Sequence, residues 1–274
     1  MGCFHGKVDW NEFEACMEES CKKLGLCDLN SENISNIFHR YTNHFHLTQQ
    51  QLQECLIELN IPLTEDLRQN FNFFLECPKY SKIVQRQNLK IEYKKDYFKQ
   101  LYSVKKLSTF AIILGKGKIN DKYRTLFLTY DIDASGYLSK WEITSLITDI
   151  IEISLEIIPQ IGKIYFPSKD SVISKQVENL VAMKLNFIEY FRYLILEDNY
   201  KEISCSDFVR IMHQQDLKFL LNHKSLRSFI MNNFKQCQKE FENLKKEDED
   251  FENERDQYLR YNQNRRETKL TLFK

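Results

Sequence analysis

Glycine and proline are scarce in this sequence, with seven Gly and four Pro in 274 residues. Because these residues begin and end most turns, their scarcity disfavours turn-rich all-β folds and favours long helices. Lysine plus arginine and aspartate plus glutamate number 39 each, which leaves no formal net charge. The chain therefore carries no electrostatic signal for binding nucleic acid or an anionic membrane. No apolar run approaches the roughly 20 residues that a membrane-spanning helix requires.

Cysteine patterns typical of metal or redox sites are also missing. The chain has eight cysteines, and none forms a Cys-x-x-Cys pair. We therefore expect reduced thiols that serve mainly as small packing residues, in a protein of the cytoplasm. Three histidines at positions 39, 44 and 46 lack the cysteine or carboxylate spacing of a zinc site. Phosphate loops and nucleophile signatures are absent as well, so the sequence predicts a protein that is not an enzyme.

Phenylalanine, in contrast, is abundant, and apolar residues recur at helical rather than strand spacing. The sequence thus predicts an all-α fold. We expect a first helix that Asp9 caps and Gly25 stops, and a second helix that begins near Ser31. Pro159 and Pro167 are expected to interrupt the chain further on, because proline cannot donate the helical hydrogen bond.

Residues 131–142 carry the motif with the clearest chemistry. They read Asp-Ile-Asp-Ala-Ser-Gly-Tyr-Leu-Ser-Lys-Trp-Glu, which matches the twelve-residue EF-hand calcium loop. Calcium takes about six to eight oxygen ligands, so alternate residues of such a loop turn inwards, and Gly136 permits the sharp bend. The predicted ligands are side-chain oxygens, one backbone carbonyl at position 7 and a water-mediated or direct contact at position 9: Asp131, Asp133, Ser135, Tyr137, Ser139 and Glu142.

Amphipathic helices are expected on both sides of this loop. The apolar residues at 143, 146, 147 and 150 follow the i, i+3, i+4, i+7 pattern of a half-buried helix, and a similar stripe precedes the loop at 123, 126, 127 and 130. We therefore predict one bound Ca²⁺ ion per chain. Ser135 stands where many loops have a third aspartate, so we expect an affinity in the sensor range or weaker.

A partner loop for this hand is predicted at 196–207, after a helix that starts around Val172. EF-hands usually occur in pairs because each leaves an apolar face and a loop edge that the other covers. Ile203, at position 8 of the second loop, should therefore pair with Leu138 at position 8 of the first. Leu196 occupies the place of the first ligand, and Lys201 that of the glycine, so we predict no cation in this loop.

Two further ligand-poor loops are predicted at 40–51 and 95–106. Residues 110–131 read Phe-Ala-Ile-Ile-Leu-Gly-Lys-Gly-Lys-Ile-Asn-Asp-Lys-Tyr-Arg-Thr-Leu-Phe-Leu-Thr-Tyr-Asp, an apolar helix that ends in a small basic, glycine-containing turn. This stretch resembles the join between hands two and three of neuronal calcium sensor and calaxin-like proteins, and 203–221 resembles their fourth hand. The resemblance implies four hands in two lobes, with an apolar groove that holds a target helix.

The predicted architecture is an all-α tandem EF-hand protein with two lobes and a long C-terminal helix. An N-terminal arm covers 1–27, a ligand-poor lobe covers 28–117, and a lobe with the intact calcium loop covers 118–224. A charged, coiled-coil-like helix is expected over 225–274. The chain departs from the family in its three ligand-poor hands, in the long insert between the last two hands, and in this tail.

The C-terminal helical block, expected over 208–261, carries an apolar stripe within a very charged sequence. Its members recur in alternating steps of four and three residues, as in a coiled coil. We predict that this seam binds a helical or filamentous protein partner, through Ile230, Phe234, Phe241 and Leu244. The alternative is a long helix that packs against the lobes of its own chain.

The N-terminus contains Gly2 and Cys3, a pair that resembles an N-myristoylation start with a cysteine available for palmitoylation. Three functional hypotheses follow from the sequence. The first is a non-enzymatic calcium sensor or adaptor that binds a partner helix. The second is an architectural subunit of a ciliary or other cytoskeletal assembly, in which calcium is constitutive or irrelevant. The third is an acylated adaptor at the membrane periphery, the one case in which we expect membrane contact.

Overall fold

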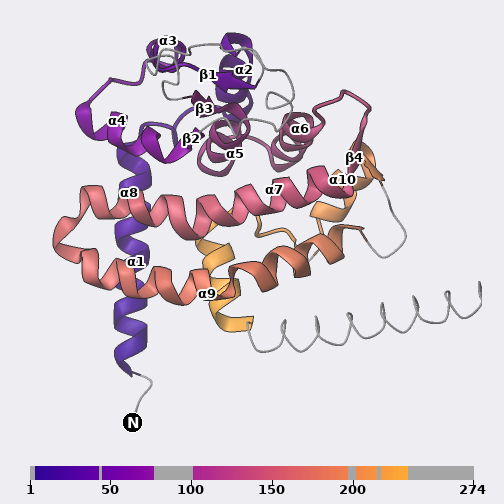
Figure 1. Cartoon of the computed structure of the whole chain (residues 1–274). Helices are drawn as coiled ribbons and strands as arrows, with labels where there is room; N and C mark the ends of the chain where they lie inside the picture. Colours follow the sequence, from indigo (N-terminus) through magenta and orange to yellow (C-terminus); the bar gives the residue numbers. More distant parts are fainter. Residues whose placement is uncertain (1–3, 43–44, 77–100, 197–201, 215–216, 234–274) are drawn as a thin grey trace, which may run out of the picture. The chain divides into compact units, whose positions relative to one another are not determined.

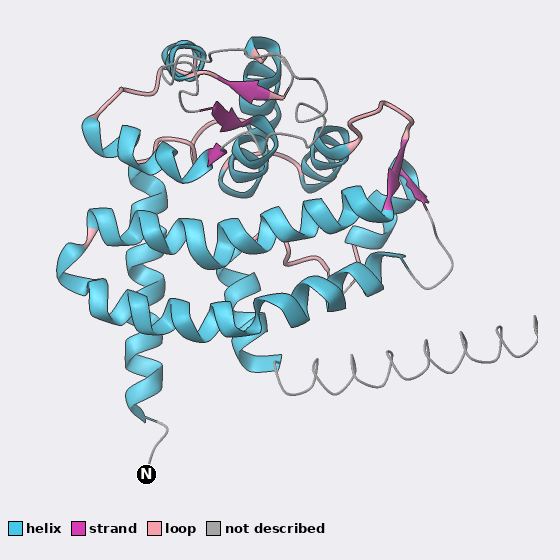
Figure 2. Cartoon of the chain, viewed as in Figure 1, coloured by secondary structure: helices cyan, strands magenta, loops and turns pink. Residues whose placement is uncertain are grey.

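The computed structural model describes residues 4–42, 45–76, 101–196, 202–214 and 217–233 of the chain. The chain divides into two units, Met1–Met231 and Asn232–Lys274, and all described residues except Asn232 and Asn233 belong to the first. Helices make up most of the described residues, so the predicted helical character is confirmed, with only short strands between them (Figures 1 and 2). No helix in this described part is long and apolar enough to cross a membrane.

Helix α1 (Phe4–Lys23) begins earlier than the sequence predicted. Asp9, the predicted cap, therefore lies inside the helix. Its end agrees with the prediction: Gly25 adopts a positive φ of 73°, a conformation that glycine reaches without steric cost. Helix α1 packs across α8 (Ile158–Tyr165) and α9 (Asp170–Leu196). The crossing with α8 is close, since a Cβ atom at Gly162 would collide with the side chain of Met17.

The described part of the predicted first lobe begins with helices α2 (Ser31–Tyr41), α3 (Gln49–Glu58) and α4 (Glu65–Phe71), the last of which runs into the 3-10 turn η1 (Asn72–Phe74). Helix α2 starts where the sequence predicted, and the Asn30 side chain accepts a hydrogen bond from the Asn33 backbone at its first turn. Its buried stripe packs on α5 (Val104–Leu114), an almost wholly buried helix.

Two small antiparallel sheets join the loops between these helices. Strands β1 (His46–Leu47) and β2 (Leu75–Glu76) flank β3 (Leu101–Ser103), and Leu47 lies opposite Tyr102. Strands β4 (Tyr137–Ser139) and β5 (Glu202–Ser204) form the second sheet. Leu138 lies opposite Ile203 there, as the sequence predicted, and both side chains are buried.

Helices α6 (Ile119–Tyr130) and α7 (Lys140–Glu152) flank residues 131–139, and α7 continues through the π-helical turn η4 (Ile153–Ile157) into α8. The prediction that Pro159 interrupts the chain is wrong. The π-helical turn directly precedes the proline, and the amide of Ile158 donates to the carbonyl of Ile153, five residues earlier. Beyond α8, Pro167 does end the helix, since it opens the short 3-10 turn η5 (Pro167–Lys169) that leads into α9.

The continuous block expected over 208–261 is also interrupted. Helix α10 (Cys205–Met212) ends before a non-helical segment, and helix resumes over 223–233, where Asn222 accepts a hydrogen bond from the Ser225 amide. Arg227 on this last segment is fully buried and binds both carboxylate oxygens of Glu14 on α1, at 2.8 and 2.7 Å. The two described ends of the unit are thus held together by a buried ion pair.

Candidate metal centre

The carboxylates predicted to bind calcium meet in the structure. Asp131 directly follows α6, Asp133 lies in the loop, and Glu142 lies in the first turn of α7. One carboxylate oxygen from each of these three residues lies within 4.8 Å of those of the other two. This is the single group of three or more potential Asp, Glu, His or Cys ligands within the described ranges.

The first half of the loop is wound around Asp131. Its Oδ1 accepts a hydrogen bond from the Ser135 amide at 2.9 Å, and its Oδ2 accepts one from the Gly136 amide at 3.0 Å. Gly136 has a φ of 79°, so the sharp bend depends on the residue that best tolerates this conformation. The Ser135 hydroxyl donates to the Tyr137 carbonyl at 3.0 Å, which brings the predicted ligands at positions 5 and 7 together.

The second half of the loop is organised by Glu142. Ser139 caps α7, and the backbone amide and the hydroxyl of Ser139 both donate to Oε2 of Glu142, at 2.9 and 2.8 Å. The other oxygen, Oε1, accepts a hydrogen bond from the Ile132 amide at 3.3 Å, across the loop. Although acidic, Glu142 is only 7 % exposed. The closing carboxylate therefore already faces the start of the loop.

These groups suit a hard, doubly charged cation. All six predicted ligand atoms are oxygens, and three of the six residues are carboxylates. Hydrogen bonds from Ser135 hold the pKa of Asp133 below its usual range, which keeps this exposed carboxyl ionised and able to bind a metal. The donor set and the carboxylate spacing thus fit Ca²⁺.

The described end of the loop predicted at 196–207 resembles that of 131–142 in its strand and its helix cap, but differs in its side chains. Ser204 caps α10 by accepting from the Asp207 amide at 3.2 Å, as Ser139 caps α7. Asp207, however, accepts a hydrogen bond from Arg210, and Leu196 is a buried apolar residue at the position of the first ligand. Lys201 lies outside the described residues.

The loop ends at 51 and 106 show the same capping pattern. Thr48 and Gln51 form a capping box at the start of α3, and Ser103 caps α5 by accepting from the Lys106 amide at 3.5 Å. Gln51 and Lys106 occupy the place that Glu142 holds in the calcium loop, and neither offers a carboxylate. The rest of the 95–106 loop is largely outside the described residues.

The sequence did not single out a buried acid next to the metal loop. Asp149 lies on α7 within the apolar stripe, is 6 % exposed, and accepts a hydrogen bond of 2.6 Å from the Tyr130 hydroxyl. Burial raises the pKa of Asp149 to about 6, although the Tyr130 hydrogen bond opposes the shift. An acidic residue inside an otherwise apolar helical stripe was the available signal for this interaction.

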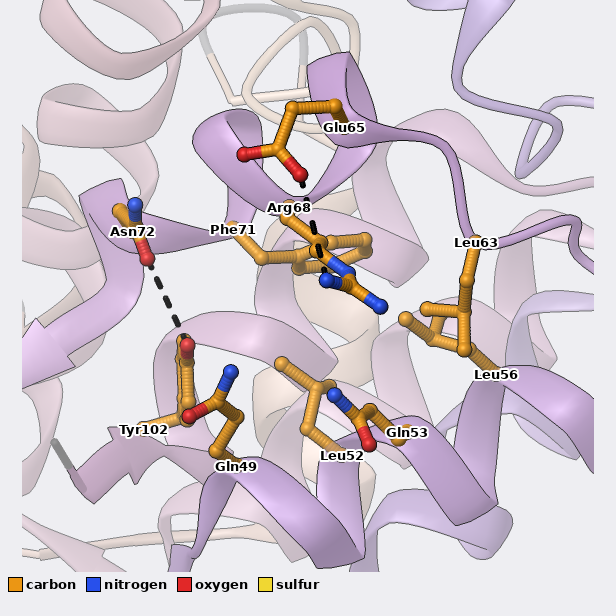
Figure 3. A pocket seen from close by; sticks show the side chains of 10 residues that line it. All are labelled: Gln49, Leu52, Gln53, Leu56, Leu63, Glu65, Arg68, Phe71, Asn72 and Tyr102. Atoms are coloured by element: carbon orange, nitrogen blue, oxygen red, sulfur yellow. Dashed lines mark hydrogen bonds and ion pairs between the residues drawn. The ribbon is translucent and has the colours of Figure 1, made fainter.

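A cavity of about 250 Å³ opens between α3 and α4 (Figure 3). Its lining includes the apolar side chains of Leu52, Leu56 and Phe71, and the Arg68 side chain, which pairs with Glu65, lies in the middle of the view. Further polar groups, among them the Tyr102 hydroxyl that donates to Asn72 at 3.5 Å, lie around it.

The structure corrects part of the predicted partner-binding seam. Ile230 is completely buried against the rest of the chain, so it contributes to internal packing and is not presented to a partner. The other members of the seam, Phe234, Phe241 and Leu244, lie outside the described residues, as do the predicted lipidation sites Gly2 and Cys3.

Comparison of the chain with protein-family models, with curated proteins and with solved structures found no match.

Proposed function

We propose that this chain is a non-enzymatic EF-hand protein that binds one Ca²⁺ ion at Asp131–Glu142 and acts by binding a partner helix. The orientation of Glu142 carries the proposal. Its two oxygens reach Ser139 at one end of the loop and Ile132 at the other, beside the carboxylates of Asp131 and Asp133. A bidentate acid in this place completes the oxygen shell that calcium prefers.

The pairing of the loops supports a tandem EF-hand organisation. Leu138 faces Ile203, and Leu47 faces Tyr102, so the residues at position 8 of the four predicted loops meet two by two. Both residues of each pair are buried, and each pair links two of the predicted loops. In this proposal the four hands form two lobes, and only the third hand keeps its cation site.

The partner in this proposal is an amphipathic helix that offers apolar side chains. The cavity between α3 and α4 supports the idea, because its lining combines the apolar side chains of Leu52, Leu56 and Phe71 with polar groups. The architectural hypothesis also has a specific observation in its favour. Glu142 already faces the loop, so a metal would find its ligands arranged with little rearrangement of α6 and α7.

Calorimetric titration of Ca²⁺ into the wild type, Glu142→Gln and Asp207→Asn proteins tests the metal site. Glutamine retains the shape and capping capacity of Glu142 but removes the charge and the second anionic oxygen, so affinity should fall by about two orders of magnitude or more. Asp207→Asn makes the matched change in the loop predicted to hold no cation, and its affinity should equal that of the wild type. Two bound ions per chain, or unchanged binding by Glu142→Gln, would contradict the proposal.

Affinity purification from native cells, with calcium and with a chelator, separates the two forms of the proposal. A sensor should gain or lose a partner when calcium is removed, because the metal must favour one state of the protein. An architectural subunit should keep the same cytoskeletal partners in both conditions. In the presence of calcium, the wild type and Glu142→Gln should recover different partners if the protein is a sensor, and the same partners if it is an architectural subunit.

A further inference from the structure

Three buried polar side chains connect the helices around the candidate metal loop. The Tyr130 hydroxyl on α6 donates to Oδ2 of Asp149 on α7 at 2.6 Å, and the Thr109 hydroxyl on α5 lies 2.9 Å from the Tyr130 oxygen. All three residues are buried. Breaking such a hydrogen bond in a protein interior costs free energy, because the buried polar group that is left without a partner cannot form a hydrogen bond with water instead.

This relay is attached to both ends of the loop. Tyr130 is the residue immediately before the first predicted ligand, Asp131. Asp149 follows the closing ligand Glu142 by seven residues, which places it about two helical turns along the same face of α7. The short hydrogen bond between Tyr130 and Asp149 therefore links the helix that enters the loop to the helix that leaves it.

Helix α5 makes a second contact with both sides of the loop. The Lys105 ammonium lies 5.7 Å from the ring centroid of Tyr130 and 5.6 Å from that of Trp141. These two rings belong to the residues next to the first and last predicted ligands. Cation–π contacts of this kind are individually weak, but here one lysine contacts both flanks at once.

The charge of Asp149 makes the relay expensive. The nearby cations are Lys105 and Lys106 on α5, and Lys106 is paired at 3.1 Å with Glu152, which is itself on α7. Asp149 thus remains a buried carboxyl whose closest donor is the Tyr130 hydroxyl. A buried carboxylate is unfavourable for stability. We therefore look for the role of Asp149 in the arrangement of α6 and α7 that its hydrogen bond fixes.

We propose that the Tyr130–Asp149 hydrogen bond is a brace that holds α6 and α7 in the arrangement in which Glu142 already faces the loop. The brace pre-organises the loop for Ca²⁺, and both residues act as positioning residues, since neither is a predicted ligand. This inference rests on the proposed function. It adds that the hand binds Ca²⁺ more tightly than the same three carboxylates would in a loop without the brace. It also adds that α6 and α7 open little when the ion binds.

Tyr130→Phe is the direct test, and Tyr123→Phe is its matched control. Tyr123 is also a buried tyrosine of α6, and its ring packs edge-on against His213. Calcium titrations of the full chain by calorimetry should show affinity about five- to tenfold weaker for Tyr130→Phe, because a loop that is no longer braced must be ordered on binding. Tyr123→Phe should match the wild type.

A second pair of variants identifies the hydrogen bond as the cause. Asp149→Asn keeps an oxygen that can accept from Tyr130, so its calcium affinity should stay within about threefold of the wild type. Asp149→Leu has no acceptor and should weaken binding as much as Tyr130→Phe. This pair also serves as the test if circular dichroism shows that Tyr130→Phe fails to fold.

The possible outcomes separate the brace from the metal site itself. If the wild type binds one calcium ion and Tyr130→Phe binds it equally well, the brace is overturned and the proposed function stands. Equal weakening by Asp149→Asn and Asp149→Leu would also overturn it, since the acceptor would then be irrelevant. A wild type that binds no calcium overturns both proposals.

Discussion

The loops 131–142 and 196–207 end in the same way, with a short strand followed by a serine-capped helix, but carry different side chains at the predicted ligand positions. Each contributes one strand to the sheet of β4 and β5, and each is followed by a helix with a serine cap, Ser139 or Ser204. Among the residues that the structure describes, three carboxylates come together in the first loop alone. In the second, the acid at the corresponding place, Asp207, accepts from Arg210 instead.

This difference separates the parts of the loop that support folding from the parts that bind a cation. Strand pairing buries Leu138 and Ile203, and the serine caps satisfy backbone amides, whether or not a metal is bound. Neither interaction depends on the residues predicted to bind a cation. If 131–142 binds Ca²⁺ as proposed, 196–207 can still support it through strand pairing without binding an ion itself.

The largest expected effect on stability concerns the strand pair to which both loops contribute. Leu138→Ala and Ile203→Ala each remove a buried side chain from the centre of the strand pair, and each should lower the free energy of unfolding by about 2–5 kcal/mol. Urea denaturation of the metal-free protein would measure both values. The two losses of stability should be similar, because Leu138 and Ile203 lie opposite each other in the strand pair and are buried to a similar degree.

Leu128→Ala is the control for these two variants. Leu128 lies on α6 and is 67 % exposed, so the same chemical change should alter stability by less than about 0.5 kcal/mol. A large cost for Leu138→Ala with almost none for Ile203→Ala would show that the second loop does not support the first.

A smaller effect on stability is expected at Asp149. This acid is buried on α7, whereas the buried residues of α10 include no acid. The pKa of Asp149 is raised to about 6, so the folded protein binds a proton more tightly there than the unfolded chain does. The stability from this proton is present at low pH and is lost as pH rises through about 6. From pH 7 to pH 4.5, the wild type should gain about 2 kcal/mol relative to Asp149→Asn.

Urea denaturation of both proteins at the two pH values tests this difference without calcium. The asparagine variant removes the titrating group at constant size, so changes caused by other carboxyls cancel in the comparison. A gap between the two proteins that does not change with pH would mean that Asp149 is not the proton-binding group.

The smallest effect is expected at the two caps. Ser139→Ala and Ser204→Ala each remove a side-chain hydrogen bond at a helix start and should cost about 1 kcal/mol. Their effects on calcium should differ. Ser139 is a predicted ligand and donates to Glu142, so only its loss should weaken calcium binding in titrations. Weaker binding by Ser204→Ala would show that the second loop contributes to the metal site.

Much of the arrangement of the paired loops could be predicted because it depends on local spacing. The positions of Asp131 and Glu142 in a twelve-residue loop predicted both the carboxylate cluster and the strand partner of Leu138. The helix start near Ser31 was also predicted, and α2 begins at that residue. The first helix was predicted too short, because Asp9 was read as a cap although the helix extends back to Phe4.

The interruption at Pro159 was mispredicted because a proline is compatible with a helix when the preceding turn widens. The π-helical turn before it supplies that widening, and the helix continues to Tyr165. Ile230 was assigned to an exposed seam for a related reason. A heptad-like spacing indicates an apolar face but not which surface covers it, and here the chain itself covers this residue.

The sequence by itself determined the helical character and the positions of the carboxylates in the loop 131–142, since both depend on residues close together in the chain, and the matching loop positions of Leu138 and Ile203 predicted their pairing. Only the tertiary structure decided which distant groups meet. Arg227 binds Glu14 across 213 positions, and Tyr130 binds Asp149 across 19. Such contacts depend on how helices pack, because packing sets both the distance between two side chains and the burial that makes their hydrogen bond strong.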